Sequence, residues 1–425
     1  MMKKKMLSLL CCVLLCISML SGCANKNADT SEQTQGAEEE TPVDKTGEVS
    51  LLVWCGSEEE QTLLGEMVES FKKQYEGERT FNITVEIESE SSCKDTLLGD
   101  VLNGADVFAF PDDQLMALIA SGALEPIEDT KIKEANSESS VEAASYDGKL
   151  YAYPMTADNG YFMYYNKAYF TEEDVKELDR MLEAAAKVDK QVMMDWSSGW
   201  YLYSFFGGSG LEFGLNDDGI TNYCTWNSTE GEIKGKDIAE AMLAIAKNPG
   251  FASGGDSDFL DGARAGTVIA GVNGVWNATT LQEIWGSNYA AVKLPSYTCN
   301  NKQVQLSSFA GYKMVGVNAY SDEKEWANKF ADWITNEENQ TLRFERREQG
   351  PSNNKASESP EVLQSPAIQA LIQQSEFAKL QRVGANYWDP IYQYGEAIVK
   401  GNIKSDKLQS LLDTLVEGIT ATQVK

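Results

Sequence analysis

The order of the apolar segments predicts an α/β fold, in which helices cover a parallel β-sheet. Strand-like runs, either apolar or alternating, occupy Val49–Trp54, Phe81–Ile87 and Ala105–Phe110. Apolar residues repeat at helical spacing in the stretch after each run, over 58–75, 94–102 and 114–120. Strands that alternate with helices form parallel sheets, and ligands bind such sheets beyond the carboxyl ends of the strands. Roughly 380 residues follow the N-terminal segments, which predicts two domains or one large bilobal body.

The first residues predict export and a lipid anchor. Lys3–Lys5 precede an apolar run, Met6–Leu20, that is too short to span a bilayer as a helix. The run ends in Leu20-Ser21-Gly22-Cys23, and a lipoprotein-processing peptidase requires small residues before the cysteine. We therefore predict a signal peptide over residues 1–22 and lipidation of Cys23. The alternative is an ordinary signal peptide with an incidental cysteine.

Residues 23–47 are rich in Glu, Gln, Thr, Ser and Ala and contain no aromatic residue. Such a segment buries too little apolar surface to offset its ordering entropy, so we predict a disordered tether. The globular part is then expected on the extracytoplasmic side of the cell membrane.

Composition excludes several classes of function. Without the three lysines of the signal, the formal charge of −29 becomes −32, which repels phosphate backbones and argues against a nucleic-acid partner. The chain has no His, which removes Ser-His-Asp sites and His-ligated zinc. We predict no cofactor and no metal. The cysteines after Cys23 favour buried free thiols, although a disulfide between the first two stays open; they are Cys55, Cys93, Cys224 and Cys299.

Several segments, in order, resemble the family 1 solute-binding proteins of ABC importers, the maltose-binding-protein group. The most specific is Tyr146-Asp147-Gly148-Lys149-Leu150-Tyr151-Ala152-Tyr153-Pro154. The others are Val53-Trp54, Ala105-Asp106-Val107-Phe108, Ser121-Gly122-Ala123-Leu124, Tyr164-Tyr165-Asn166-Lys167, Val272-Asn273-Gly274-Val275-Trp276 and Gly350-Pro351-Ser352. Each is weak alone, but their shared order extends the resemblance from Glu48 to about Leu415.

The resemblance implies a two-lobed periplasmic-binding-protein-like fold of type II, hinged, with the ligand cleft between the lobes. It places residues 48–157 and 314–354 in lobe 1, and residues 158–313 and 355–425 in lobe 2. The chain would cross between lobes near 157–158, 312–315 and 351–355. The implied partners are an oligosaccharide, the transmembrane subunits of an ABC permease and the membrane that holds the lipid anchor; a monomer is expected.

A sugar site needs aromatic rings for the apolar faces and carboxylates or amides for the hydroxyls. Where the chain resembles maltose-binding proteins, the matching rings are Trp200, Trp276 and either Trp388 or Tyr392, and Phe110 stands where the family carries an indole. The matching polar residues are Glu58, Asp113 and Asp158. From the same stretches we add Asn159, Trp196 and Asn273.

Each of these residues also has an ordinary structural role open to it. A Trp is more often a core residue, Asp158 can cap a turn, and Glu58 can be a helix-start charge. Trp200 follows Ser197-Ser198-Gly199, whose composition is typical of a loop. Gln114 stands where typical maltose binders have a basic residue after the acid, which weakens the assignment to one particular disaccharide.

Three functions follow from these residues. The first is a receptor that captures oligosaccharides, malto-oligosaccharides above all, by hinge closure and without chemical change. The second keeps the fold but binds a polyamine or another cation, because aromatic boxes with carboxylates also hold ammonium groups. The third is a surface glycosidase that uses two carboxylates.

Overall fold

The computed structural model describes residues 47–422. The predicted signal peptide, Cys23 and the predicted tether up to residue 46 lie outside the described residues. Within them, no helix combines the length and apolar character that crossing a membrane requires.

The first lobe is built on a five-stranded sheet with the strand order β2-β1-β3-β17-β6. Its strands are β1 (Glu48–Cys55), β2 (Thr80–Ile87), β3 (Val107–Pro111), β6 (Tyr153–Thr156) and β17 (Lys313–Val317). β1 pairs in parallel with both β2 and β3, as the alternation of strands and helices predicts. β17 comes from much later in the chain and runs antiparallel between β3 and β6.

Helices cover this sheet and complete a separate apolar core. They are α1 (Glu58–Gln74), α2 (Cys93–Gly99), α3 (Leu115–Ala120), α4 (Thr130–Ala135), α5 (Glu138–Ala143), α11 (Lys324–Thr335) and α12 (Glu337–Arg347), with the 3-10 turn η1 (Asp112–Gln114). α1 starts where Ser57 accepts a hydrogen bond from the backbone N–H of Glu60, and its buried stripe includes Leu63, Met67 and Phe71. The apolar periodicity in the sequence therefore located this helix.

The predicted turn at Tyr146–Lys149 is confirmed. It joins β4 (Ser145–Tyr146) to β5 (Lys149–Leu150) in an antiparallel pair. Asp147 and Gly148 have φ angles of 48° and 75°, and two consecutive positive values match the twist of a tight hairpin.

The second lobe has a five-stranded sheet with the order β11-β8-β12-β7-β13. Its strands are β7 (Phe162–Asn166), β8 (Gln191–Met193), β11 (Phe251–Ala252), β12 (Val268–Asn273) and β13 (Tyr289–Val292). β12 is parallel to β8 and antiparallel to β7. The surrounding helices are α6 (Leu178–Lys187), α7 (Gly199–Gly207), α8 (Gly235–Ala246), α9 (Asp256–Ala265), α10 (Ala278–Trp285), α14 (Pro360–Gln364), α15 (Pro366–Ser375), α16 (Trp388–Val399) and α17 (Leu408–Ile419). The short helix α13 (Asn354–Ser357) packs instead on α12 of the first lobe, where Lys355 forms an ion pair with Glu337.

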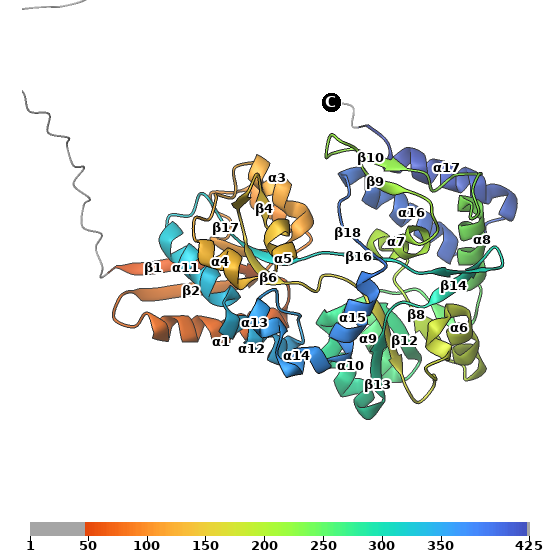
Figure 1. The fold of residues 1–425 in the computed structure, drawn as a ribbon, viewed down its shortest axis with the longest axis horizontal. Helices are drawn as coiled ribbons and strands as arrows, with labels where there is room; N and C mark the ends of the chain where they lie inside the picture. The colour runs from red at the N-terminus through yellow and green to blue at the C-terminus, as the bar shows by residue number, and fades with distance from the viewer. Residues whose placement is uncertain (1–46, 423–425) are drawn as a thin grey trace, which may run out of the picture. The chain divides into compact units, whose positions relative to one another are not determined.

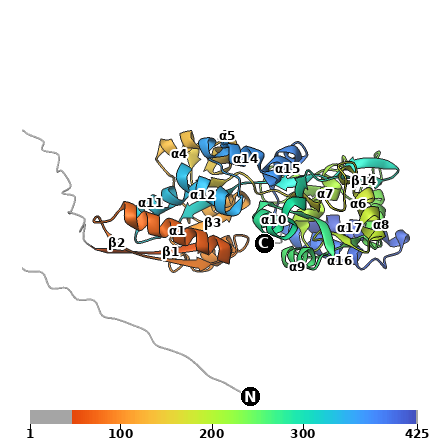
Figure 2. The same cartoon turned by 90° about the horizontal axis from the view of Figure 1, so that it is seen from below.

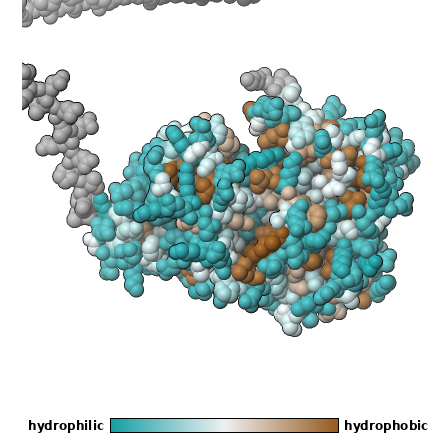
Figure 3. Space-filling view, viewed as in Figure 1, coloured by the Kyte–Doolittle hydropathy of each residue, from teal (hydrophilic) through white to brown (hydrophobic). Residues whose placement is uncertain are grey.

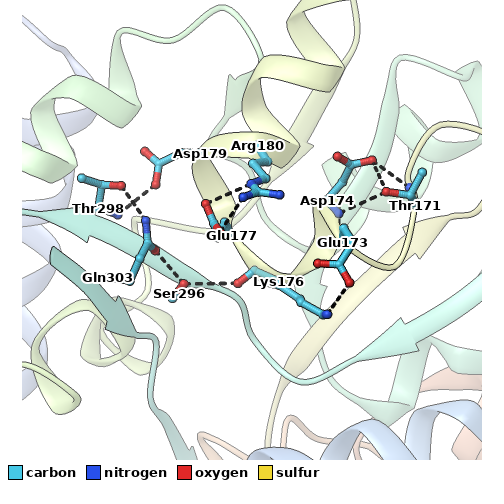
Figure 4. Close-up of polar contacts among 10 residues, drawn as sticks. All are labelled: Thr171, Glu173, Asp174, Lys176, Glu177, Asp179, Arg180, Ser296, Thr298 and Gln303. Atoms are coloured by element: carbon cyan, nitrogen blue, oxygen red, sulfur yellow. Dashed lines mark hydrogen bonds and ion pairs between the residues drawn. The ribbon is translucent and has the colours of Figure 1, made fainter. Parts of the chain in front are cut away.

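Figures 1 and 2 show α1, α11 and α12 beside the first sheet, on the left, and α8, α16 and α17 around the second lobe, on the right. Three short pairs add to this lobe: β9 (Phe213–Leu215) with β10 (Asn222–Cys224), β14 (Ser296–Cys299) with β15 (Lys302–Gln305), and β16 (Ser308–Ala310) with β18 (Ala378–Leu380). Polar contacts fix the β14–β15 hairpin on α6 and on the 3-10 turn η2 (Asp174–Lys176) that precedes it (Figure 4). The Thr298 N–H donates to Asp179 over 2.9 Å and the Ser296 hydroxyl donates to the Lys176 carbonyl over 3.2 Å.

Three chain segments connect the lobes and hydrogen-bond to one another. The Ala157 N–H donates to the Gly350 carbonyl over 2.9 Å, and the Asn159 N–H donates to the Gly311 carbonyl over 3.2 Å. A bridge between Thr156 and Pro351 adds to the first contact. The crossings are thus short backbone segments placed side by side, an arrangement that allows hinge motion. The lobe boundaries given above stay a prediction.

The cysteines in the described residues are free thiols, and the disulfide left open between Cys55 and Cys93 is not formed. Burial raises the pKa of Cys93 to about 12 and that of Cys55 to about 11, so both stay protonated and act as apolar core residues.

Hydrophilic side chains cover most of the face seen in Figure 3, in keeping with the acidic composition. The largest brown patch on this face lies over α15, and exposed Leu363 and Ile372 belong to α14 and α15.

Candidate ligand-binding site

The two central sheets direct the ends of their parallel strands to polar loops. In the first sheet, β1 and β3 end just before Gly56 and Asp112, and antiparallel β17 begins with Lys313 opposite Pro111 at the same edge. In the second sheet, β8 and β12 end before Met194 and Gly274, and antiparallel β7 begins there, with Phe162 opposite Asn273. These edges are where side chains for a ligand are expected.

Two indole rings of the second lobe form the centre of the candidate site. Trp200 lies in the first turn of α7 and Trp276 in η3 (Val275–Asn277); their ring centroids are 5.7 Å apart and their planes meet at 36°. Tyr161 supports Trp200 edge-on at 4.6 Å, and its hydroxyl donates to the Trp200 carbonyl over 2.7 Å. Both indoles are half-buried. The Trp200 Nε1–H is itself buried and has no partner among the described residues.

Gly274 makes room for the Trp276 ring, since a Cβ at this position would lie 2.0 Å from its Cζ3 atom. Trp276 is oriented by a carboxylate, because its Nε1–H donates to Asp256 over 2.8 Å. Buried Asn273 donates to the other Asp256 oxygen over 2.8 Å and accepts the Gly274 N–H over 2.9 Å. Asn273 therefore supports the site from behind, and Asp256 fixes the plane of the Trp276 ring.

An acidic pair stands at the end of β3 in the first lobe. Asp112 is almost fully buried, accepts the Tyr312 N–H over 3.0 Å and forms an ion pair with Arg382. Asp113 accepts the Gln381 amide over 2.8 Å through one oxygen, while its Oδ1 is buried without a partner among the described residues. Burial, with a smaller effect from the adjacent Asp112, raises the pKa of Asp113 to about 7.

A lysine of the first sheet lies close to one of the two indole rings of the second lobe. Lys313 forms an ion pair with Glu90 at 2.7 Å, and its Nζ lies 5.6 Å from the centroid of the Trp276 ring. Because Lys313 begins β17 and Trp276 follows β12, this contact joins the two edges. It is a cation–π contact by distance.

Asp158 and Asn159 lie on the first crossing segment. The Asp158 carboxylate is buried and accepts the Gly350 N–H from the third crossing segment. Burial raises its pKa to about 6, although nearby Lys313 lowers it. Asp158 therefore joins the first and third crossing segments at the hinge, close to Lys313.

The other candidates lie around this centre. Trp388 begins α16, contacts Tyr387 at a centroid distance of 5.0 Å, and lies beside Gly199, the residue before Trp200. Tyr392, one helical turn later, is 44% exposed. Glu58 is an exposed first-turn residue of α1, the helix-start role that the sequence left open.

Two predicted site residues are core residues instead. Trp196 is fully buried, packed against Phe251 at 4.5 Å and Phe205 at 5.2 Å. Phe110 is fully buried and packs on Phe108 at 5.5 Å. Neither ring presents a face to a ligand, because neighbouring core side chains enclose both.

Local structure also differs from expectation at two residues. The segment after Ser198 is helix α7 rather than a loop, so Trp200 is held by a helical turn. Gln114, which replaces the expected basic residue, donates to the carbonyls of Glu90 and Ser91 over 2.8 and 3.1 Å. It therefore fixes the loop that carries Glu90.

Sequence reasoning missed several residues of this arrangement, among them Glu90, Asp256, Lys313, Gln381 and Arg382. A signal existed for the first two, which follow the ends of β2 and β11 and so belong to the same sheet edges. Gln381 and Arg382 follow a short strand far along the chain, and no local pattern predicts that they reach Asp113 and Asp112.

Comparisons with known proteins identify the family of the chain. The model of the bacterial extracellular solute-binding protein family matches residues 66–370. The galactooligosaccharide-binding protein of Bacillus subtilis (strain 168) is 25% identical over 399 residues, 89% of this chain and 87% of that protein. The maltodextrin-binding protein MdxE of the same strain is 25% identical over 338 residues, 74% of this chain and 76% of that protein.

Solved structures show the same fold. A structure with acarbose is 28% identical, has a TM-score of 0.77 and covers 88% of this chain and 99% of its own. The maltodextrin binding protein MalE1 from L. casei BL23, without ligand, is 22% identical, has a TM-score of 0.72 and covers 88% of this chain and 100% of its own. The predicted two-lobed α/β fold is confirmed.

Proposed function

This chain belongs to the family of bacterial extracellular solute-binding proteins, and we propose that it captures a short neutral oligosaccharide between its lobes. One observation carries the proposal: the Trp200–Trp276 ring pair is accompanied by two buried polar atoms without partners among the described residues, Trp200 Nε1 and Asp113 Oδ1. Buried polar groups normally have a partner, so an unpartnered group beside a candidate cleft offers a position that a ligand atom can satisfy.

A carbohydrate supplies what these groups lack. The apolar faces of a pyranose ring pack on indole rings, and a sugar hydroxyl both donates and accepts hydrogen bonds. One hydroxyl oxygen accepts the Trp200 Nε1–H, and another hydroxyl donates to Asp113 Oδ1. The two groups come from different lobes, so a ligand that uses both favours the closed form.

The charges around the site favour a neutral ligand over a cation. Asp112 is paired with Arg382 and Glu90 with Lys313, while both oxygens of Asp256 receive N–H groups. A polyamine would have to displace these partners. Among the carboxylates of the site in the described residues, Asp113 alone has a buried, unpartnered oxygen that could receive an ammonium group. Its pKa, raised to about 7, weakens even that anion near neutral pH.

Two sugar classes follow from the relatives. We propose malto-oligosaccharides first, because a maltodextrin-binding relative and the acarbose structure share the fold. Galacto-oligosaccharides are the second candidate, because the galactooligosaccharide-binding relative matches a larger share of this chain.

We propose binding without chemical change. The adjacent carboxylates Asp112 and Asp113 are held by Arg382 and Gln381 rather than set on opposite sides of a scissile bond. Product analysis after incubation with labelled maltotriose and galactotriose tests this directly: released monosaccharide would establish hydrolysis.

The proposed cycle is hinge closure on the sugar followed by delivery to the membrane subunits of an ABC permease. Closure turns on the three crossing segments, and the ligand stabilises the closed state by its contacts to both lobes. We further propose that the protein acts as a monomer, held on the extracytoplasmic side of the cell membrane by a lipid on Cys23. Metabolic labelling with a fatty acid, lost in Cys23→Ser, tests the anchor.

Isothermal titration tests the ligand class. Maltose, maltotriose, maltotetraose and two galacto-oligosaccharides form one panel, with spermidine and putrescine as cationic comparisons. Heat with a sugar and none with either amine supports the proposal. Heat with the amines alone would refute the sugar proposal and indicate a cation-binding protein.

A further inference from the structure

Two neighbouring side chains of the second lobe reach the acidic pair of the first. Gln381 and Arg382 follow β18, which pairs with β16 just before the second crossing segment. The Gln381 N–H donates to the Ala310 carbonyl over 3.0 Å, so this short segment is fixed on the second lobe.

Each of the two residues contacts one acid. The Gln381 Nε2–H donates to Asp113 Oδ2 over 2.8 Å, and Arg382 Nη1 pairs with Asp112 Oδ2. The remaining Asp112 oxygen accepts the Tyr312 N–H, so Asp112 has a partner at both oxygens. Gln381 and Asp112 are both buried, whereas the Arg382 side chain is 39% exposed.

This arrangement leaves only one oxygen of the pair without a partner, Asp113 Oδ1. The amide of Gln381 fixes the plane of the Asp113 carboxylate, and the guanidinium of Arg382 balances the negative charge of Asp112 beside it. Without Arg382, two adjacent carboxylates would repel each other in a buried place.

We propose that Gln381 and Arg382 are positioning residues for ligand capture, which clamp Asp112 and Asp113 across the lobes and leave Asp113 Oδ1 to receive a ligand hydroxyl. The inference rests on the proposed function for the identity of the guest. The clamp itself involves no ligand and can be tested without one.

The ligand-free test is a carboxyl NMR titration of the purified protein labelled in aspartate. The resonance that Asp113→Asn removes is expected to titrate near pH 7 in the parent. The groups that act on it are Asp112, which raises its pKa, and Gln381 and Arg382, which lower it. Arg382→Met and Gln381→Leu should therefore move the titration to higher pH, and Arg382→Lys should restore it.

The ligand test is titration calorimetry with the sugar that binds the parent. Gln381→Leu and Arg382→Met are each expected to weaken binding about tenfold at pH 7, the effect of misplacing one hydrogen bond to a charged group. Raising the pH to 9 should recover part of the loss, because Asp113 is then ionised in every variant. Arg346→Met is the matched control, since Arg346 pairs with Glu66 at 3.1 Å on the exposed surface.

The outcomes separate the two proposals. An Asp113 titration that is the same in parent, Gln381→Leu and Arg382→Met overturns the clamp, whatever the ligand. Affinities equal to that of Arg346→Met at both pH values also overturn it. A shifted titration in a protein that binds no sugar of the panel supports the clamp and refutes the carbohydrate assignment.

Discussion

Replacing Trp200 by Phe isolates the indole N–H at the candidate site. The ring stays, and its edge contacts with Tyr161 and Tyr201 at 4.6 and 5.2 Å can persist, while the buried donor without a described partner is lost. A hydrogen bond of this kind contributes about 0.5–1.5 kcal/mol net, so affinity should fall about 2- to 12-fold. Trp200→Ala also removes the stacking face and should cost about 2 kcal/mol or more, about 30-fold.

Trp196→Phe is the matched control for that experiment. Its Nε1–H is also buried without a partner among the described residues, but its ring packs between Phe205 and Phe251 in the core. The variant should bind sugar like the parent and melt at a lower temperature, because the smaller ring leaves a cavity. Calorimetric titration and thermal unfolding of the two Phe variants measure both effects. If Trp200→Phe binds as tightly as the parent, or Trp196→Phe weakens binding equally, the assignment of Trp200 to the ligand is refuted.

Three further predictions concern the acid pair, the core and the ring support. Burial raises the folded-state pKa of Asp113 above its usual 3.8 to about 7, so its contribution to stability is fully present below pH 3.8 and is lost as the pH rises through 7. The melting temperature of Asp113→Asn should therefore vary less between pH 5 and 8 than that of the parent; an identical profile would contradict this pKa. Glu60→Gln leaves the buried Arg343 guanidinium without its anion. Urea titrations should then show a free energy of unfolding that is lower by about 3–5 kcal/mol. The double variant that also carries Arg343→Met should recover part of this loss. Gly274→Ala should displace the Trp276 ring, because the added Cβ would lie 2.0 Å from Cζ3. We expect weaker sugar binding with a melting temperature close to that of the parent. Parent-like affinity would remove Trp276 from the site.

The fold was predictable because its signals are local and repeated. The strand at Val49–Trp54, the helix that starts at Glu58 and the turn at Tyr146–Lys149 each depend on neighbours in sequence, and each lies within a residue or two of its predicted place. The late strand β17 depends instead on pairing with β3, some 200 positions earlier, and the sequence placed a crossing there only through the family resemblance.

The candidate site was predictable only in part, for the same reason. Trp200 directly follows Gly199 and Trp276 comes two residues after Gly274, which predicted rings near backbone turns, and the structure brings them within contact distance. Trp196 lies only a few residues before Trp200, but its ring points into the core, where it packs against Phe205 and Phe251. These contacts depend on the tertiary structure and not on the neighbours in sequence. Arg382 and Gln381 act only through tertiary contacts to Asp112 and Asp113, which no periodicity encodes.

Ion pairs at the site lower the free-energy cost of closing the two lobes on a ligand. Closure removes these groups from water, and an unpaired buried ion costs several kcal/mol, more than a few sugar contacts return. With Glu90 held by Lys313 and Asp112 by Arg382, closure buries neutral pairs.

The binding free energy then comes from the indole faces and from hydrogen bonds to a guest that carries no charge. Sugar affinity should consequently change less than about threefold between 0.05 and 1 M NaCl, because Debye screening acts on charge–charge attraction between partners and a neutral guest has none. A steep loss of affinity with salt in calorimetric titrations would show that the ligand is held by charge, and the neutral-guest argument would fail.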